Sequence, residues 1–192
     1  MIVSALQLQI IYGSLLGDGC LDRPKLGNSR LIQRHSERDE HYARFKHAAL
    51  RPLSLGLFKH VYLDRRTGKT YSQIGFNTVR DRFFTELYWL FYRNNEKHVP
   101  EIILTQLNKV ALAVFVGDDG TFDRSSGTVK ISVDRYDMQD RQLTRRWLAE
   151  RFGIEATIQK DRIYILRRSY QQLINTMPEN VLPYLSRRLG FP

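Results

Sequence analysis

The sequence contains a single cysteine, Cys20, and no run of apolar residues long enough to cross a membrane. One cysteine excludes a disulfide framework and a cysteine-based zinc site, so Cys20 is expected to pack as a small residue in or near the core. A membrane span needs about 18 consecutive apolar residues. The N-terminus carries neither a basic-then-apolar secretory signal nor an Arg- and Ser-rich transit peptide. We therefore expect no membrane partner and an intracellular location, in the cytoplasm of a prokaryote or in an organelle that encodes the chain.

Two further kinds of site are missing from the sequence. Its histidines follow no spacing that is typical of a metal site: His35, His41, His47, His60 and His98. No glycine-rich segment has the pattern that binds nucleotide phosphates or a dinucleotide. The sequence therefore gives no support to a zinc-dependent nuclease or to the common nucleotide-binding folds.

Acidic residues are scarce relative to basic ones. The 192 residues include 30 Lys and Arg against 20 Asp and Glu, a formal net charge of +10, and basic residues are in excess in both halves of the chain. With 42% hydrophobic and 11% aromatic residues, the chain is expected to form one large or two small globular domains. A positive surplus of this size points to a polyanionic partner, most often a nucleic acid. The alternative is a basic protein whose charge only favours solubility.

Two short segments half a chain apart are nearly the same. Residues 12–19 (YGSLLGDG) and 113–120 (AVFVGDDG) are apolar runs with small residues, and each ends in an acid followed by glycine. The two acids are Asp18 and Asp119. A repeated unit of this kind predicts two carboxylates at one site, which is the arrangement that a divalent metal ion and a phosphodiester need. Taken singly, each Asp-Gly pair is also a common turn.

Both segments belong to predicted helices, over residues 4–17 and 108–117, that are apolar on nearly all sides and therefore buried. Small residues along them would let two helix backbones pack closely: Gly13, Ser14, Gly17, Ala111, Ala113 and Gly117. The acids then lie at adjacent helix C-termini, where the helix dipole disfavours a carboxylate by a few tenths to about 1 kcal/mol. Repulsion between the two carboxylates adds to that cost. A bound Mg²⁺ ion, which prefers carboxylate and carbonyl oxygens, would offset both effects.

Each of these helices is followed by the same order of predicted elements. In the first half we expect strands within 20–35, a helix over 39–50, strands at 57–64 and 70–77, and a helix over 79–92. In the second half we expect strands within 121–134, a helix over 138–152, strands within 155–167, a helix over 169–177, and then a tail. The predicted domains are residues 1–93 and 108–192, joined by an ordered connector at 94–107.

The two motifs resemble those of the LAGLIDADG homing endonucleases, in the form with two motifs in one chain. Residues 112–120 (LAVFVGDDG) align with all nine positions of the family name, and residues 11–19 keep Gly13 and the closing Asp-Gly. The resemblance implies an α+β fold of two pseudo-symmetric αββαββα halves, whose antiparallel sheets form a saddle over double-stranded DNA. It also implies a monomer that makes a Mg²⁺-dependent double-strand break in a long asymmetric DNA site.

The resemblance places the metal ions at the closing acid of each motif, which corresponds to Asp18 and Asp119 in this chain. Gly17 and Asp118, the residues that precede these acids, are expected beside the metal ions. Mg²⁺ is the predicted cofactor, with Mn²⁺ or Ca²⁺ as substitutes for binding.

Further catalytic residues follow from the same resemblance. A basic residue after the third helix of each half corresponds to Lys97 and Arg188, where a cation would stabilise the phosphate or activate a water molecule. A polar strand residue that positions water corresponds to Gln33 and Ser132. For Lys97 and Arg188, the alternative is a solvated base on the surface.

Side chains able to contact DNA are spread over the predicted strands and turns. They are Arg23, Lys25, Arg30, Arg34, Arg65, Arg66, Lys69, Tyr71 and Gln73 in the first half, and Arg124, Lys130, Arg135, Lys160 and Arg162 in the second. Arg reads guanine and Gln reads adenine in the major groove, although any one Arg can equally contact a phosphate. Two other functions fit the same scaffold: an RNA-binding intron maturase, whose partner is intron RNA, and a DNA-binding protein that does not cut.

Overall fold

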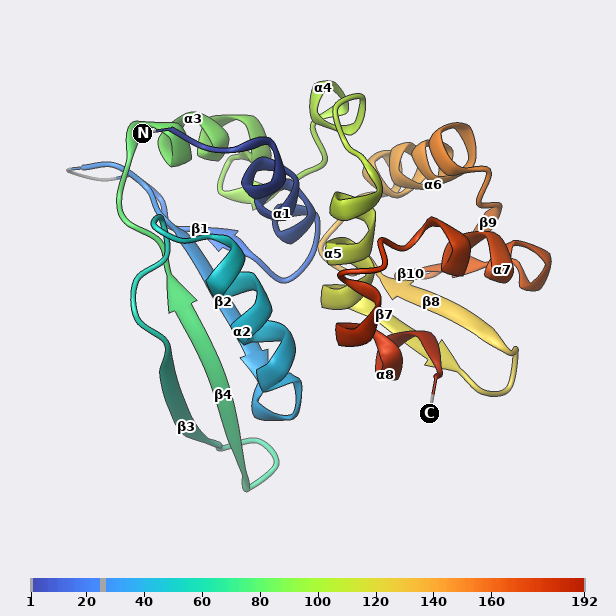
Figure 1. The fold of residues 1–192 in the computed structure, drawn as a ribbon, viewed down its shortest axis with the longest axis horizontal. Coiled ribbons are helices and arrows are strands. Elements are labelled where there is room, and N and C mark those ends of the chain that lie inside the picture. The colour runs from blue at the N-terminus through green and yellow to red at the C-terminus, as the bar shows by residue number, and fades with distance from the viewer. Residues whose placement is uncertain (1, 25–26, 192) are drawn as a thin grey trace.

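The chain folds as two similar halves, each with the order helix, two strands, helix, two strands, helix. The structure, a computed structural model, describes residues 2–24 and 27–191. Figure 1 shows the first half in blue to green and the second in yellow-green to red, lying side by side. The fold class predicted from the sequence is therefore confirmed.

The helices and strands of the repeated unit have counterparts in both halves, and each half also has short helices of its own. The first half contains α1 (Ala5–Leu16), β1 (Cys20–Leu21), β2 (Leu31–Ser36), the 3₁₀ helix η1 (Glu37–Asp39), α2 (Glu40–Ala49), β3 (Phe58–Asp64), β4 (Lys69–Asn77) and α3 (Arg82–Phe91). The second half contains α5 (Lys109–Asp119), β7 (Gly120–Asp123), β8 (Thr128–Ser132), α6 (Met138–Phe152), β9 (Ala156–Gln159), β10 (Arg162–Ile165) and α7 (Arg167–Thr176), followed by η2 (Leu182–Tyr184) and α8 (Ser186–Leu189). Between the halves lie β5 (Tyr92–Arg93), β6 (Glu96–Lys97) and α4 (Glu101–Leu104).

Each half contains a four-stranded antiparallel sheet with the same strand order, β1-β2-β4-β3 in the first and β7-β8-β10-β9 in the second. Successive side chains of a strand point to opposite faces of the sheet. One face of each sheet packs against the core and includes the fully buried Leu31, Phe76, Ile131 and Ile163. The opposite face carries mostly polar side chains. Each half therefore has one outward-facing polar sheet surface.

The helices α1 and α5 lie side by side at the centre of the molecule, where the two halves meet (Figure 1). Most of their residues are buried, because their sequences are apolar on nearly all sides. Their backbones approach so closely that a Cβ atom on Gly13 would lie 2.5 Å from the carbonyl oxygen of Ala111. The side chains of Ser4 and Asn108 cap the two helix N-termini, so backbone N–H groups there have partners.

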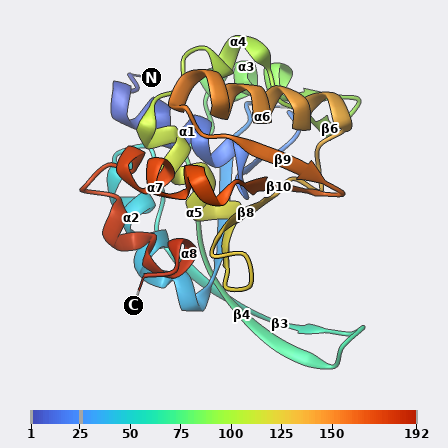
Figure 2. The same ribbon diagram turned by 90° about the vertical axis from the view of Figure 1, so that its right-hand side faces the viewer.

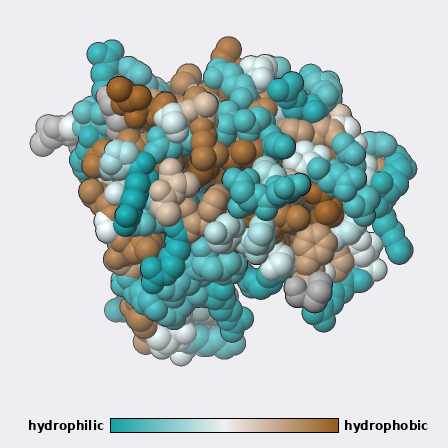
Figure 3. Space-filling view, viewed as in Figure 1, coloured by the Kyte–Doolittle hydropathy of each residue, from teal (hydrophilic) through white to brown (hydrophobic). Residues whose placement is uncertain are grey.

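The remaining helices cover the core side of the sheets. α2 packs against β2 and β4, α6 packs against β9, and α7 packs against β8. The face shown in Figure 3 is largely hydrophilic, with apolar groups scattered across it. In the part of the chain that the structure describes, no helix combines the length and apolar character that a membrane crossing requires.

The predicted order of elements is correct, but some boundaries differ. Only two residues of the predicted first strand, Cys20 and Leu21, pair with β2. The predicted tail after residue 177 instead contains η2 and α8, and α8 packs back onto β7. Leu185 and Leu189, four residues apart and fully buried, hold this segment on the second half.

The close contact between α1 and α5 can be tested at Gly13. We expect Gly13→Ala to destabilise the protein by about 1–3 kcal/mol, because the added methyl group meets backbone atoms that cannot move independently. Urea denaturation measures the change. Gly56→Ala is the control, since a Cβ atom there has no neighbour within 4 Å. Equal stability of the two variants would contradict the close packing.

Candidate active site

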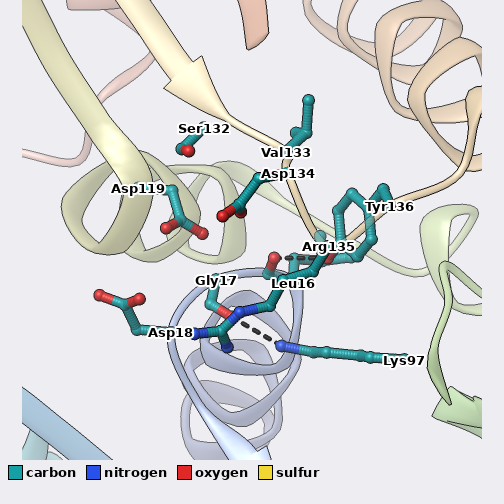
Figure 4. Close-up of a pocket in the computed structure, with 10 residues that line it drawn as sticks. All are labelled: Leu16, Gly17, Asp18, Lys97, Asp119, Ser132, Val133, Asp134, Arg135 and Tyr136. Atoms are coloured by element: carbon teal, nitrogen blue, oxygen red, sulfur yellow. Dashed lines mark hydrogen bonds between the residues drawn. The ribbon is translucent and has the colours of Figure 1, made fainter. Parts of the chain in front are cut away.

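The acids of the two motifs meet in one cavity. Asp18 follows Gly17, the residue that caps α1, and Asp119 is the last residue of α5. Because the two helices lie side by side, both carboxylates line a cavity of about 210 Å³ (Figure 4). Its other lining residues are Leu16, Gly17, Lys97, Ser132, Val133, Asp134, Arg135 and Tyr136. Each half of the molecule thus contributes one motif carboxylate to a common site.

Neither carboxylate has its usual acidity. Burial, together with the neighbouring Asp118, raises the pKa of Asp18 to about 6. Burial, Asp18 and Asp118 raise the pKa of Asp119 to about 8. Both groups are therefore disfavoured as anions, which is the condition that a bound cation reverses.

The donor set around these acids limits how a cation could bind. Nowhere in residues 2–24 and 27–191 do three or more His, Cys, Asp or Glu side chains form a group that could hold a metal ion. Mg²⁺ is commonly held by only one or two carboxylates, with backbone, water and phosphate oxygens completing its shell. Two carboxylates with raised pKa values, close to backbone carbonyl groups, fit that pattern.

Two basic side chains occupy equivalent places in the two halves: Lys97 lines this cavity, and Arg188 lines a neighbouring pocket that also includes Asp18. Lys97 Nζ donates hydrogen bonds to the carbonyl oxygens of Gly17 at 2.7 Å and Gly19 at 2.8 Å. Arg188 Nη1 donates to the carbonyl oxygen of Gly120 at 3.2 Å. Gly19 and Gly120 directly follow the two motif acids, so the bases correspond to each other in the pseudo-symmetry. Burial lowers the pKa of Lys97 to about 8.

Arg135, expected from the sequence to contact DNA, lies in the cavity itself. Figure 4 shows its guanidinium group near Gly17 and Asp18. Against the larger effect of burial, its positive charge lowers the pKa of Asp18 and Asp119. Arg135 is thus a third cation beside the acids, from the loop after β8, and the sequence motifs gave no sign of this position.

The predicted pairing of Gln33 with Ser132 is wrong, because the two side chains point to opposite faces of their sheets. Gln33 is fully buried on the core face of β2, where its Oε1 accepts a hydrogen bond from Lys46. Ser132 lies on the outward face of β8 and lines the cavity. The pairing of β1 with β2 and of β7 with β8 makes Arg34 the counterpart of Ser132.

A buried ion pair that the sequence analysis missed lies beneath the cavity. Lys46 Nζ of α2 donates to both carboxylate oxygens of Asp118 in α5, at 2.9 and 3.0 Å, and both side chains are 0% exposed. The hydroxyl group of Tyr42 donates to the same carboxylate at 3.0 Å. This pair joins the two halves. Its signal in the sequence is a lysine at a core-facing position of α2, four residues after the buried Tyr42 and four before the buried Leu50.

Glycine makes room for this pair, and both of the residues that precede the motif acids, Gly17 and Asp118, already have partners within the protein. A Cβ atom on Gly17 would lie 2.4 Å from the Cβ atom of Asp118. The Asp118 carboxylate is fully engaged by Lys46 and Tyr42, so its side chain points into the core and away from the cavity. The carbonyl oxygen of Gly17 accepts a hydrogen bond from Lys97.

Several of the residues expected to contact DNA share the outward faces of the two sheets. In the first half, strand register places Arg34, Lys69, Tyr71 and Gln73 on one face. In the second half, Lys130, Ser132 and Arg162 share the corresponding face. Arg23, Arg65, Arg66, Arg124 and Lys160 are exposed in loops and turns.

Some residues of the predicted DNA-contact set already form ion pairs within the protein, and one lies outside the described residues. Arg30 forms an ion pair with Asp22 at 3.4 Å, and Lys130 forms one with Asp123 at 3.3 Å. Arg162 lies 3.7 Å from the carboxylate of Asp161. Lys25 lies outside the described residues.

The buried pair generates a prediction about stability. Lys46→Met leaves Asp118 as an uncompensated buried charge, and we expect it to destabilise the protein by about 3–5 kcal/mol. The double variant Lys46→Met/Asp118→Leu removes both charges and should recover most of that loss. Guanidinium denaturation of the three proteins measures the difference. A double variant as unstable as the single one would contradict the proposed coupling.

The raised pKa of Asp119 generates a second prediction. Folding favours its protonated form, so its contribution to stability is present below the unfolded pKa of about 4 and is lost as the pH rises through about 8. An Asn side chain cannot ionise. We therefore expect the melting temperature of Asp119→Asn, relative to the parent chain in EDTA, to increase between about pH 5 and about pH 9. A difference that is constant with pH would show that Asp119 ionises normally.

Comparisons with known proteins identify relatives of two kinds. The chain is 27% identical to the DNA endonuclease I-ChuI of Chlamydomonas applanata, over 80% of this chain and 76% of that protein. It is 27% identical to the cytochrome b mRNA maturase bI2 of Saccharomyces cerevisiae, over 95% of this chain and 47% of the maturase. It is 25% identical to the maturase bI2 of Debaryomyces hansenii, over 95% of this chain and 73% of that protein. The chain thus spans about half the length of the Saccharomyces maturase.

Solved structures match the fold at low sequence identity. The homing endonuclease I-WcaI bound to its DNA recognition sequence matches all of this chain and 89% of its own, with a TM-score of 0.88 at 17% identity. The N-terminal LAGLIDADG domain of DUF199/WhiA matches 93% of this chain and 82% of its own, with a TM-score of 0.50 at 13% identity. The family model of the LAGLIDADG DNA endonucleases matches residues 8–173, which is most of the chain. This chain therefore belongs to the LAGLIDADG DNA endonuclease family.

Proposed function

We propose that this chain is a site-specific DNA endonuclease that cuts both strands of a long, asymmetric double-stranded site in a reaction that depends on a divalent metal ion. One observation carries the proposal: two motif carboxylates, one from each half, line a single cavity beside Lys97 and Arg135. Hydrolysis of a phosphodiester needs a concentration of hard oxygen ligands and cations at the reacting phosphate.

Asp18 and Asp119 would hold the metal, with backbone carbonyl oxygens of Gly17 and Asp118 as additional hard donors. Mg²⁺ suits this set, and Mn²⁺ or Ca²⁺ would substitute in binding. When bound, the metal would supply positive charge that stabilises the reacting phosphate.

The basic residues would act on the phosphate from the two halves of the molecule. The guanidinium group of Arg188 offers several donors to a phosphate, whereas Lys97, with its pKa of about 8, exchanges a proton near neutrality. Each lies next to the glycine that follows a motif acid, where a cation stabilises negative charge developing on a phosphate. Ser132, on the outward face of β8, would orient a water molecule. Gln33 would act only indirectly, through Lys46.

The two sheets would form the DNA-binding saddle. Their outward faces carry Arg, Lys, Tyr and Gln side chains, and a two-stranded β-ribbon fits the major groove. A single chain with internal pseudo-symmetry supplies both sides of the site, so a monomer would suffice. Because the side chains differ between the halves, the two halves of the DNA site would differ in sequence.

A second function is favoured by the two maturase relatives: binding of intron RNA without DNA cleavage. A filter-binding comparison of double-stranded DNA with structured intron RNA, at matched salt, separates the two functions. Tighter binding of RNA together with no cleavage of any DNA would favour the maturase function. A non-cutting DNA-binding protein would show tight DNA binding alone.

The motif acids provide the decisive variants. We expect Asp18→Asn and Asp119→Asn each to lower the rate of Mg²⁺-dependent plasmid linearisation by at least about 100-fold. Mutation of a residue that only hydrogen-bonds to a metal ligand already lowers metal affinity or activity by about 10–100-fold, and loss of a ligand should cost at least as much. Binding of the site in Ca²⁺ should persist. Candidate sites are recovered by selection from a plasmid library.

Glu86→Gln is the matched control. Glu86 is an exposed carboxylate on α3 that pairs only with Arg82 among the described residues, so its loss should leave linearisation unchanged. If both motif variants cut as fast as the parent chain, the assignment of Asp18 and Asp119 as catalytic acids is wrong.

A further inference from the structure

The second hairpins of the two halves differ in length. β3 and β4 pair over seven positions, from Phe58 opposite Gly75 to Asp64 opposite Lys69. The corresponding strands β9 and β10 pair over only four positions. Arg34 pairs with Gly75, and its counterpart Ser132 pairs with Arg162, so the β3–β4 ladder begins at the position where the β9–β10 ladder ends. At a rise of about 3.3 Å per residue, the positions from Gly75 to Lys69 extend the first hairpin by roughly 20 Å beyond the second.

The longer hairpin also leaves the body of the protein. Figure 2 shows β3 and β4 projecting well beyond the helices, whereas β9 and β10 stay close to α6 and α7. Val61 and Leu63 in β3 are 62% and 61% exposed, while Ile163 and Ile165 in β10 are buried. Among the described elements, no helix covers either face of the outer part of this ribbon (Figure 2). A two-stranded ribbon without a covering layer is marginally stable in water, so this one has the character of a binding element.

The longer hairpin also carries more basic and aromatic side chains in total than the shorter one. Residues 58–77 contain four basic residues and one acid, whereas residues 156–165 contain two basic residues and one acid. Arg65, Arg66 and Lys69 at the tip form no ion pair with any described side chain. Tyr62 and Tyr71 stack with ring centroids 5.8 Å apart, on the face that also carries Lys69.

We propose that the first half recognises a longer stretch of DNA than the second, with the β3–β4 hairpin reaching about six base pairs farther from the cleavage centre than β9–β10. This inference rests on the proposed binding of double-stranded DNA. The extra length of roughly 20 Å corresponds to about six base pairs at about 3.4 Å each. The major groove accepts a two-stranded ribbon, and the basic tip supplies phosphate contacts at its far end.

The single cysteine allows this reach to be mapped. In a Cys20→Ser background, Arg66→Cys and Lys160→Cys place one thiol at the tip of each second hairpin. Each protein is labelled with an iron–EDTA chelate and bound, in Ca²⁺, to a DNA site selected for binding. Radical cleavage then marks the nearest sugars. We expect the marks from Arg66→Cys to lie about six base pairs farther from the centre of the site than those from Lys160→Cys.

The salt dependence of binding gives an independent measurement. The double variant Arg65→Ala/Arg66→Ala should make the negative slope of log affinity against log salt shallower by up to about 1.8. This is the change expected from the loss of two phosphate contacts. Arg145→Ala/Arg146→Ala, on α6, is the matched control and should leave the slope unchanged. Equal reach of the two labels, or an unchanged slope for the tip variant, would overturn the inference. Both measurements need only binding of DNA. If the chain binds this DNA without cutting it, the proposed cleavage function is wrong, but the difference in reach between the two hairpins can still be measured.

Discussion

The close packing of α1 against α5 is the constraint on which the rest of this structure depends. Two carboxylates from different halves can share one cavity only if the helices that carry them meet almost backbone to backbone. Gly13 permits that approach within the helix pair, and Gly17 permits it at the rim of the cavity. Because these helices are buried on nearly all sides, the interface between the halves is also the hydrophobic core. The geometry of the site and the stability of the fold are therefore set by the same contacts.

That packing also concentrates negative charge, and the protein compensates for only part of it. Asp118 raises the pKa of both Asp18 and Asp119, after the larger effect of burial. Lys46 pairs with Asp118 inside the core, where water cannot solvate the carboxylate. Arg135 acts from the open side of the cavity. These cations offset the effects of burial and repulsion only in part, so the pKa values of Asp18 and Asp119 stay raised.

The sequence predicted what local patterns encode and missed what register and distant contacts decide. Apolar spacing and turn residues gave the order of the elements, and the repeated motifs located the two acids. Gln33 was misplaced because a shift of one residue along a strand turns its side chain to the other face. The pair of Lys46 and Asp118 joins residues 72 positions apart, so no local pattern contains it. The sequence likewise predicts a tail where α8 lies, because the burial of α8 depends on contacts with β7 that are distant in the sequence.

The ion pairs that join the halves limit how this protein could be recombined. Lys46 of the first half pairs with Asp118 of the second, and Asp39 of η1 pairs with Arg187 and Arg188 of α8. In both cases the partners are encoded on opposite sides of the connector. A chimera that fused one half of this chain to the complementary half of another family member would receive only one member of each pair from this chain. Unless the other half supplied the matching partner, Lys46 or Asp118 would be a buried charge without its ion-pair partner. Exchange of halves between family members therefore requires that these partner positions be transferred together.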